Sequence, residues 1–287
     1  KEQYLKVLDA LIEKASEGQE IYKELKLTNR AIAFDAGFGV LYEIFSNRYA
    51  EPIEKIENHL ARLQFTELFE LCNAYKPSSG SPNYNFVLSK LKKQGLSIKS
   101  ISDKKNVKAH FEKITLSEDS AFKVLNMAYD LKLLRKSEKH VGYLEQKERF
   151  LQELKPDLQD FEDLTEEDFK DLKNAVDRKT FYAKLFSSEL NFQEILSFFN
   201  YMNEETKYIT MHKTKGTGID NVLVVLDEYF WSNDYDFKTI FSNDGDSQKK
   251  QKSQKLFYVA CSRAKKNLRC VRLVSNKEEE DEITSFF

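Results

Sequence analysis

Apolar residues recur at helical spacing through the middle of the chain, from about residue 51 to residue 200. Such spacing gives each segment one apolar face, which predicts a series of amphipathic helices. These helices are expected over residues 52–75, 84–95, 117–134, 165–186 and 191–202. Near the amino terminus, residues 1–18 and 30–45 show the same spacing, and residues 21–29 form a short extended stretch between them.

The pattern changes near Lys207, where short apolar runs rich in β-branched residues predict strands. The strands are expected over residues 207–212, 221–228 and 267–275. A helix is predicted over residues 253–267, between the last two strands, and this order of elements favours a parallel sheet. Residues 231–250 are mostly polar, so we expect them to form an exposed insertion.

Together these elements predict an α/β domain interrupted by a helical one. The α/β domain takes its first part from residues 1–50 and its remainder from residues 201–287, while residues 51–200 form a large all-helical insertion. Only nine glycines and four prolines occur, which favours long helices over a turn-rich β fold. The expected fold class is a parallel-sheet α/β domain with a helical insertion, helix-rich overall.

Composition narrows the functional classes. A formal net charge of −2 excludes a general binder of polyanions, so any surface for nucleic acid must be local. Three cysteines without a CxxC pair and four scattered histidines indicate neither a disulfide framework nor a metal site, and fit a reducing cytoplasm. No apolar run is long enough to span a membrane. Lys1, rather than Met, opens the chain, so we expect a piece of a longer protein.

The stretch "VLVVLDE" ends in Asp227 and Glu228, as does the strand that holds magnesium in P-loop NTPases. Such a strand works with a phosphate-binding loop of the form G-x-x-x-x-G-K-[ST], and no stretch of this chain has that form. We therefore interpret the two acids as solvated residues at the end of a buried strand.

The preceding stretch "TMHKTKGTGID" is a candidate phosphate loop. Gly216 and Gly218 would let the backbone approach a phosphate, because glycine has no side chain to obstruct the approach. Nearby side chains could donate hydrogen bonds, namely Thr210, His212, Lys213 and Lys215. A tight turn into a buried strand explains the same residues, so this loop alone does not decide between the two interpretations.

A third stretch, "KLFYVACSRAKKNL", places Arg263 at the edge of a helix that can pack on the sheet, about a turn after Tyr258. Arginine is suited to hold a phosphate because its planar guanidinium gives directed, permanently charged donors. The surrounding residues are basic and include no acid between residues 249 and 269. The basic residues are Lys249, Lys250, Lys252, Lys255, Arg263, Lys265, Lys266 and Arg269.

Taken together, the two stretches resemble motifs V and VI of UvrD/Rep-type superfamily 1 helicases, T-x-H-x-x-K-G-L-E-F-x-x-V and L-x-Y-V-A-x-T-R-A-K-x-x-L. The first is matched by Thr210, His212, Lys215, Gly216 and Val222. The second is matched by Tyr258, Val259, Ala260, Arg263, Ala264, Lys265 and Leu268. This motif-level resemblance covers residues 209–274.

The resemblance implies the C-terminal half of an ATP-dependent 3′-to-5′ DNA helicase, with a RecA-like domain 2A and a 2B-like helical insertion. Arg263 would reach the γ-phosphate of ATP, which is bound with Mg²⁺ mainly by the N-terminal RecA-like domain. The implied nucleotide contacts are Arg263, Lys215, Gly216, Gly218 and Tyr258. The implied contacts to single-stranded or duplex DNA are Thr210, His212, Lys213 and Asn29.

Two departures from the family qualify these implications. Thr217 and Gly218 stand where the family usually has Leu-Glu, and Asp220 is a candidate substitute for that glutamate. The phosphate-binding loop and its magnesium-binding acids are absent, so we expect this chain to be inactive without the N-terminal half. An alternative is a non-catalytic DNA- or protein-binding module derived from a helicase, with the helical insertion as the surface for a protein partner.

Overall fold

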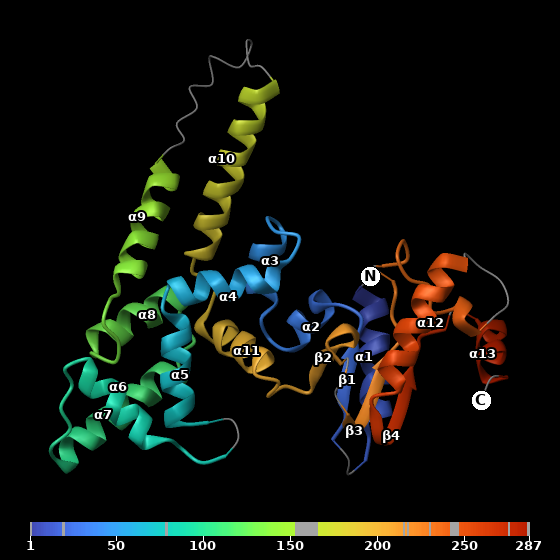
Figure 1. Cartoon of the computed structure of the whole chain (residues 1–287), viewed down its shortest axis with the longest axis horizontal. Coiled ribbons are helices and arrows are strands. Elements are labelled where there is room, and N and C mark those ends of the chain that lie inside the picture. Colours follow the sequence, from blue (N-terminus) through green and yellow to red (C-terminus); the bar gives the residue numbers. More distant parts are fainter. Residues whose placement is uncertain are drawn as a thin grey trace. The chain divides into compact units, whose positions relative to one another are not determined.

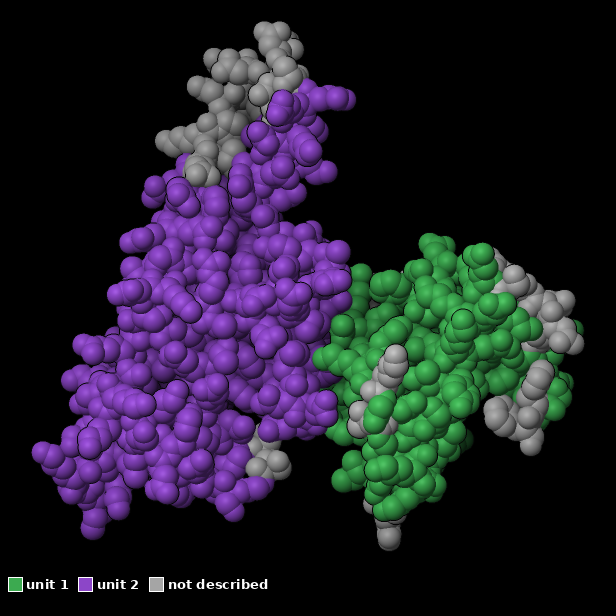
Figure 2. Space-filling view, viewed as in Figure 1, with its two compact units in different colours: residues 1–32, 206–287 green, residues 33–205 purple. Residues whose placement is uncertain are grey.

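The computed structural model describes residues 2–18, 21–77, 80–152, 166–214, 216, 218–229, 231–241, 247–274 and 276–285. The chain forms two compact units, coloured separately in Figure 2. The sheet unit combines Lys1–Ile32 with Thr206–Phe287, and the helical unit is the continuous segment Ala33–Glu205. The helical unit therefore begins before residue 51, because the helix over Gly39–Ser46 packs against other helices of that unit.

The sheet unit contains four parallel strands in the order β2-β1-β3-β4 (Figure 1). They are β1 (Lys23–Lys26), β2 (Tyr208–Thr210), β3 (Ile219–Val225) and β4 (Ala264–Val271). Leu25 of β1 lies opposite Ile209 on one side and Val224 on the other, so β1 joins the two chain segments of the unit. The parallel α/β sheet predicted from the sequence is confirmed.

Helices α1 (Glu2–Ser16) and α12 (Ser247–Cys261) pack against opposite faces of this sheet. Successive strand residues point to opposite faces, so Leu223 packs with α1 whereas Val222 and Val224 pack with α12. This burial on both faces explains why residues 222–226 are continuously apolar rather than alternating. The carboxyl-terminal helix α13 (Lys277–Thr284) belongs to the same unit.

Helix α12 begins and ends earlier than its sequence pattern suggested. The prediction of a helix over residues 253–267 was wrong at both ends, because the helix runs from Ser247 to Cys261. Residues from Ala264 onward belong to β4, where Ala264 lies opposite Ile219. Pairing with β3 therefore takes these residues from the helix, leaving only a two-residue turn that contains Arg263.

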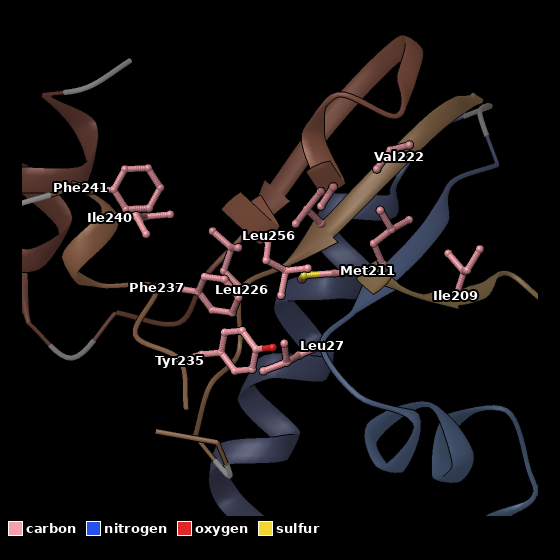
Figure 3. Close-up of a cluster of buried hydrophobic side chains, with 13 residues drawn as sticks. Leu27, Ile209, Met211, Val222, Leu226, Tyr235, Phe237, Ile240, Phe241 and Leu256 are labelled. Atoms are coloured by element: carbon pink, nitrogen blue, oxygen red, sulfur yellow. The ribbon is translucent and has the colours of Figure 1, made fainter. Parts of the chain in front are cut away.

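The segment that follows β3 is partly packed into the core, from Tyr235 to Phe241. Apolar side chains from this segment join the cluster under α12 (Figure 3). They are Tyr235, Phe237, Ile240 and Phe241, the last two in the short helix η3 (Thr239–Phe241). The Ser253 hydroxyl accepts a hydrogen bond from the Asp236 backbone at 2.9 Å, which fixes the segment to α12. The predicted exposed insertion is therefore wrong for residues 235–241, whereas residues 231–234 are exposed as predicted, and residues 242–246 lie outside the described part of the chain.

The helical unit contains nearly all of the remaining helices (Figure 1). They are α2 (Asn29–Asp35, shared with the sheet unit), α3 (Gly39–Ser46), α4 (Pro52–Arg62), α5 (Phe65–Tyr75), α6 (Tyr84–Lys93), α7 (Ile101–Thr115), α8 (Ala121–Asp130), α9 (Glu138–Gln152), α10 (Glu166–Leu185) and α11 (Phe192–Met202). Throughout the described ranges, no helix is both long and apolar enough to cross a membrane.

One predicted helix, over residues 52–75, is divided into α4 and α5 at Gln64. Gln64 has a left-handed backbone, with φ of 66°, although it is not glycine. Its buried side chain offsets this cost with hydrogen bonds, donating to the Arg135 carbonyl at 3.0 Å and accepting from the Tyr129 hydroxyl at 3.1 Å. Because these bonds come from distant residues, the helical spacing across the break could not reveal it.

Candidate nucleotide and nucleic-acid site

The residues that the sequence singled out lie at two ends of the parallel sheet. Thr210 and His212 follow one another at the carboxyl end of β2, and Asn29 follows the carboxyl end of β1. Gly218 and Arg263 instead precede the amino ends of β3 and β4. Because all strands are parallel, the first group lies at the edge of the sheet formed by the carboxyl ends of the strands. The second group lies at the opposite edge, formed by their amino ends.

The glycine loop and the turn after α12 are in direct contact. The backbone N–H of Ile219, next to Gly218, donates to the carbonyl oxygen of Arg263 at 2.8 Å. Ile219 also lies opposite Ala264, so the bond continues the parallel pairing of β3 with β4. Two segments separated by more than forty residues in sequence are thereby joined at one sheet edge. Lys215, a further predicted contact in this loop, lies outside the described residues.

The Arg263 side chain folds back toward the end of α12, the helix that precedes its turn. Its Nε donates to the Val259 carbonyl at 3.0 Å, and its Nη2 donates to the Ser262 hydroxyl at 3.1 Å. The remaining N–H groups, including those on Nη1, have no partner among the residues that the structure describes. Since the residue is partly exposed, these donors are oriented from two sides and can still bind an anion.

Tyr258 lies about one turn earlier on α12 and is 72 % exposed. Its neighbours Leu256 and Ala260 face the core, so the helix presents Tyr258 away from the sheet. An exposed aromatic ring of this size is available to contact a planar ligand. Tyr258 on α12 and Arg263 in the turn after it therefore both reach the surface.

Asp220, the candidate substitute for the missing glutamate, is already paired. Its carboxylate accepts from the Lys266 ammonium at 2.6 Å, and this bond lowers the pKa of Asp220 below its ordinary value. The pairing joins β3 to β4 across the strand edge. Asp220 therefore acts first as a partner of Lys266, and a role toward a nucleotide sugar would require breaking this bond.

At the opposite edge, the helix η2 (Met211–Thr214) carries His212 and Lys213, which are both exposed. The Nε2 atom of His212 lies 3.2 Å from the Tyr235 hydroxyl, within hydrogen-bond distance. Tyr235 is itself 9 % exposed and packed in the core, so it holds the imidazole from a fixed position. The sequence analysis missed Tyr235, because it lies in a segment that was interpreted as an exposed insertion.

The other two predicted nucleic-acid contacts are less accessible. Thr210 is 4 % exposed, which leaves little of it to contact a ligand. Asn29 is partly buried at the start of α2, beside Thr28, whose hydroxyl accepts from the Ala31 backbone at 3.3 Å. Of the four residues predicted to contact DNA, His212 and Lys213 are therefore the exposed ones.

The two acids after β3 were predicted to be solvated, and this prediction was wrong. The Tyr4 hydroxyl donates to Asp227 at 2.7 Å, and burial together with this bond raises the pKa of Tyr4. Arg272 donates to both carboxylate oxygens of Glu228, at 2.8 and 2.9 Å, and also contacts Glu279 at 3.0 Å. These bonds attach α1 and α13 to the strand end, so the acids stabilise the fold.

The run of basic residues near α12 is partly neutralised by acids from other segments. Lys252 lies 3.3 Å from Asp234 and above the Tyr235 ring, with its ammonium 4.3 Å from the ring centre. Lys249 donates to the Ser232 carbonyl at 3.1 Å. The sequence showed no acid within this run because the acids come from the segment that packs against it. In the described part of the chain, no group of acidic, histidine and cysteine side chains is arranged to hold a metal ion.

Comparison with known proteins identifies the family of this chain. The sequence model of the family described as "UvrD-like helicase C-terminal domain" matches residues 1–273. The Gabija protein GajB of Bacillus cereus (strain HuB5-5) is 35 % identical over 92 residues, covering 29 % of this chain and 14 % of GajB. The chain thus matches only a small part of that relative. No solved structure matches. Because the family match spans almost the whole chain, the protein belongs to the UvrD-like helicase C-terminal domain family.

Proposed function

We propose that this chain is the C-terminal motor half of an ATP-dependent 3′-to-5′ DNA helicase or translocase. In this proposal the sheet unit is a RecA-like domain 2A, and the helical unit is its 2B-like insertion. The observation that carries the proposal is the bond between Ile219 and Arg263, which joins the two motif segments at one edge of the sheet. A loop and an arginine held together in this way can respond jointly to a phosphate.

Arg263 is the proposed arginine finger. Its guanidinium is partly exposed and held by Val259 and Ser262, while its other donors remain available for the γ-phosphate. ATP supplies the phosphoryl group when bound with Mg²⁺, mainly by the N-terminal RecA-like domain of the same helicase. The positive charge of Arg263 would stabilise the charge that develops on that group during hydrolysis. Since this chain has no phosphate-binding loop, it should not hydrolyse ATP by itself.

The opposite edge of the sheet is the proposed DNA contact. His212 and Lys213 are exposed donors on η2, suited to phosphate oxygens of a single strand. Asn29 and Thr210 are less exposed, so they would support this surface more than they contact the DNA backbone. With the nucleotide bound at one edge of the sheet and the DNA strand at the other, the sheet unit can couple ATP hydrolysis to movement along DNA.

The decisive experiment is Arg263→Ala in the full-length protein. DNA-stimulated ATPase activity should fall by about a thousandfold or more, the effect typical of an arginine finger, while binding of a single-stranded oligonucleotide largely survives. Arg263→Lys serves as the matched variant, since it keeps the charge but loses the planar fork. It should remain strongly impaired.

Two results would contradict the proposal. Unchanged ATPase activity in Arg263→Ala would remove the assigned role and favour a non-catalytic binding module. Clear DNA-stimulated ATPase activity in the isolated chain of 287 residues would show that it needs no second half. Thermal melting of each variant checks that the loss does not come from unfolding.

A further inference from the structure

The two glycines of the loop are needed for different physical reasons. Gly216 has a φ of 85°, a conformation that strains other residues, and nothing lies within 4 Å of the place its Cβ would occupy. Gly218 has an obstruction instead, because a Cβ there would lie 2.2 Å from the Cε atom of Lys265. The same Cβ would lie 3.1 Å from the Lys265 ammonium nitrogen. The Lys265 side chain therefore rests directly on the α-carbon of Gly218.

This contact determines where Lys265 lies rather than whether the loop folds. The atoms nearest to Gly218 belong to a flexible side chain and not to the backbone, so a larger residue at position 218 would displace Lys265. Gly218 and Lys265 come from segments already joined by the bond between Ile219 and Arg263. Because residue 218 has no side chain, the Lys265 side chain and its ammonium group can lie against Gly218.

The ammonium of Lys265 has no direct partner among the described residues. The Asp220 carboxylate, which interacts with the charge of Lys265, is hydrogen-bonded to Lys266, and that bond lowers the Asp220 pKa more than the charge of Lys265 does. Lys265 is exposed, and no described residue forms a hydrogen bond or ion pair with its ammonium. An exposed cation held at one position, with no ion-pair partner among the described residues, suits an anionic ligand.

We propose that Lys265, seated on Gly218, is a phosphate-binding residue. The proposal rests on the function proposed above and extends it to a residue beside Arg263. The ligand is a phosphate group, supplied either by the bound nucleotide or by the nucleic-acid backbone. In both cases the ammonium donates to phosphate oxygens from a position that the glycine keeps open.

The test uses three variants of the full-length protein and two probes. Lys265→Ala removes the cation, and Gly218→Ala keeps the lysine but displaces it. Lys266→Ala is the matched control, because it removes an equal charge that is already paired with Asp220. The probes are a fluorescent single-stranded oligo(dT) titrated at several salt concentrations, and ATP titrated in the DNA-stimulated ATPase assay.

If the phosphate belongs to DNA, Lys265→Ala should weaken oligo(dT) binding about fivefold at 0.1 M salt and reduce the salt slope by about 0.7. If it belongs to the nucleotide, the KM for ATP should rise several-fold while oligo(dT) binding is unchanged. In either case Gly218→Ala should shift in the same direction, and Lys266→Ala should match the wild type.

The proposal is overturned if Lys265→Ala behaves like Lys266→Ala with both probes. It is also overturned if Gly218→Ala retains wild-type behaviour when Lys265→Ala does not. The contact between Lys265 and Gly218 would then have no effect on phosphate binding. Neither result would affect the role of Arg263, which its own variant tests. A wild-type protein that binds neither probe would overturn the proposed function together with this site.

Discussion

Each unit contains a histidine bonded to a tyrosine, and the two units use the pair in opposite ways. In the helical unit, Nδ1 of His59 lies 2.5 Å from the hydroxyl of Tyr143, which is completely buried. In the sheet unit, Nε2 of His212 lies 3.2 Å from the Tyr235 hydroxyl, and the imidazole remains exposed. The difference indicates that the pair in the helical unit holds helices together, whereas the pair in the sheet unit leaves its imidazole exposed, as the proposed contact with DNA requires.

The surroundings of the two histidines explain this division. His59 of α4 contacts the rings of Phe45, Tyr143 and Phe181, which belong to three other helices. Burial, which is the largest cause, and the nearby positive charges of Arg62 and other basic residues together lower the pKa of His59 to about 4. A neutral imidazole is therefore part of the interior of the helical unit, and a change in its charge should be felt as a change in stability.

The largest predicted effect concerns the apolar interior of the sheet unit. Phe237 is completely buried, so Phe237→Ala should cost about 3–5 kcal/mol in the free energy of unfolding, by lost burial and the cavity left behind. Tyr258→Ala, at a position 72 % exposed, should cost less than about 1 kcal/mol. Urea denaturation measures both. Equal effects would mean that the segment after β3 is not part of the core.

The next effect is a pH dependence in the helical unit. His59 has a folded pKa of about 4, below its ordinary value of 6.5, so the unfolded chain binds more protons between these values. Stability should therefore fall by about 3 kcal/mol as the pH decreases from about 6.5 to 4. The change should be measured as the difference between the wild type and His59→Gln, by denaturation at pH 7.5 and 4.5.

Comparing the wild type with His59→Gln removes the contributions of the other titrating groups to the pH dependence of stability. Burial also lowers the pKa of His140, which acts in the same direction, and raises that of Glu194, which acts in the opposite direction. Both residues are present in the wild type and in His59→Gln, so their contributions cancel. A wild type that loses no more stability than the variant would show that His59 is not held neutral.

The smallest effects compare the two tyrosine hydroxyls directly. Tyr143→Phe removes the hydrogen-bond partner of the His59 Nδ1 atom and should cost about 1–3 kcal/mol of stability. Tyr235→Phe keeps its ring in the core and should change stability by less than about 1 kcal/mol. It should instead weaken oligonucleotide binding about two- to fivefold, because the freed His212 must be ordered on binding. Melting curves measure the stability effects and anisotropy titrations measure binding. A binding defect in Tyr143→Phe, or a large loss of stability in Tyr235→Phe, would contradict the comparison.

Much of the fold could be predicted because it depends on local periodicity. The continuous apolar run of residues 222–226 identified a strand buried on both faces, and that strand, β3, lies inside the parallel sheet between β1 and β4. The helix predicted over residues 84–95 corresponds to α6, which ends at Lys93, and Gly95, with a φ of 85°, follows its last turn. Both features depend on neighbours in sequence, so the pattern contains the information needed.

The errors came from contacts between distant segments. The start of β4 at Ala264 depends on pairing with Ile219, and the break at Gln64 depends on partners such as Tyr129. The burial of Phe237 depends on the core under α12, to which a mostly polar segment contributes a few large side chains. Helical spacing and average polarity describe only the segment itself, and these features depend on what packs against it.

By itself, the sequence determined the family resemblance, the parallel sheet and Arg263 as the candidate for a phosphate contact, since motif spacing and local pattern survive without coordinates. Only the tertiary structure decided which charged groups are free to act. It pairs Asp227, Glu228 and Asp220 with partners far away in sequence, and it leaves Lys265 resting on Gly218. The physical reason is that neutralisation depends on distance in space, whereas the sequence records only order along the chain.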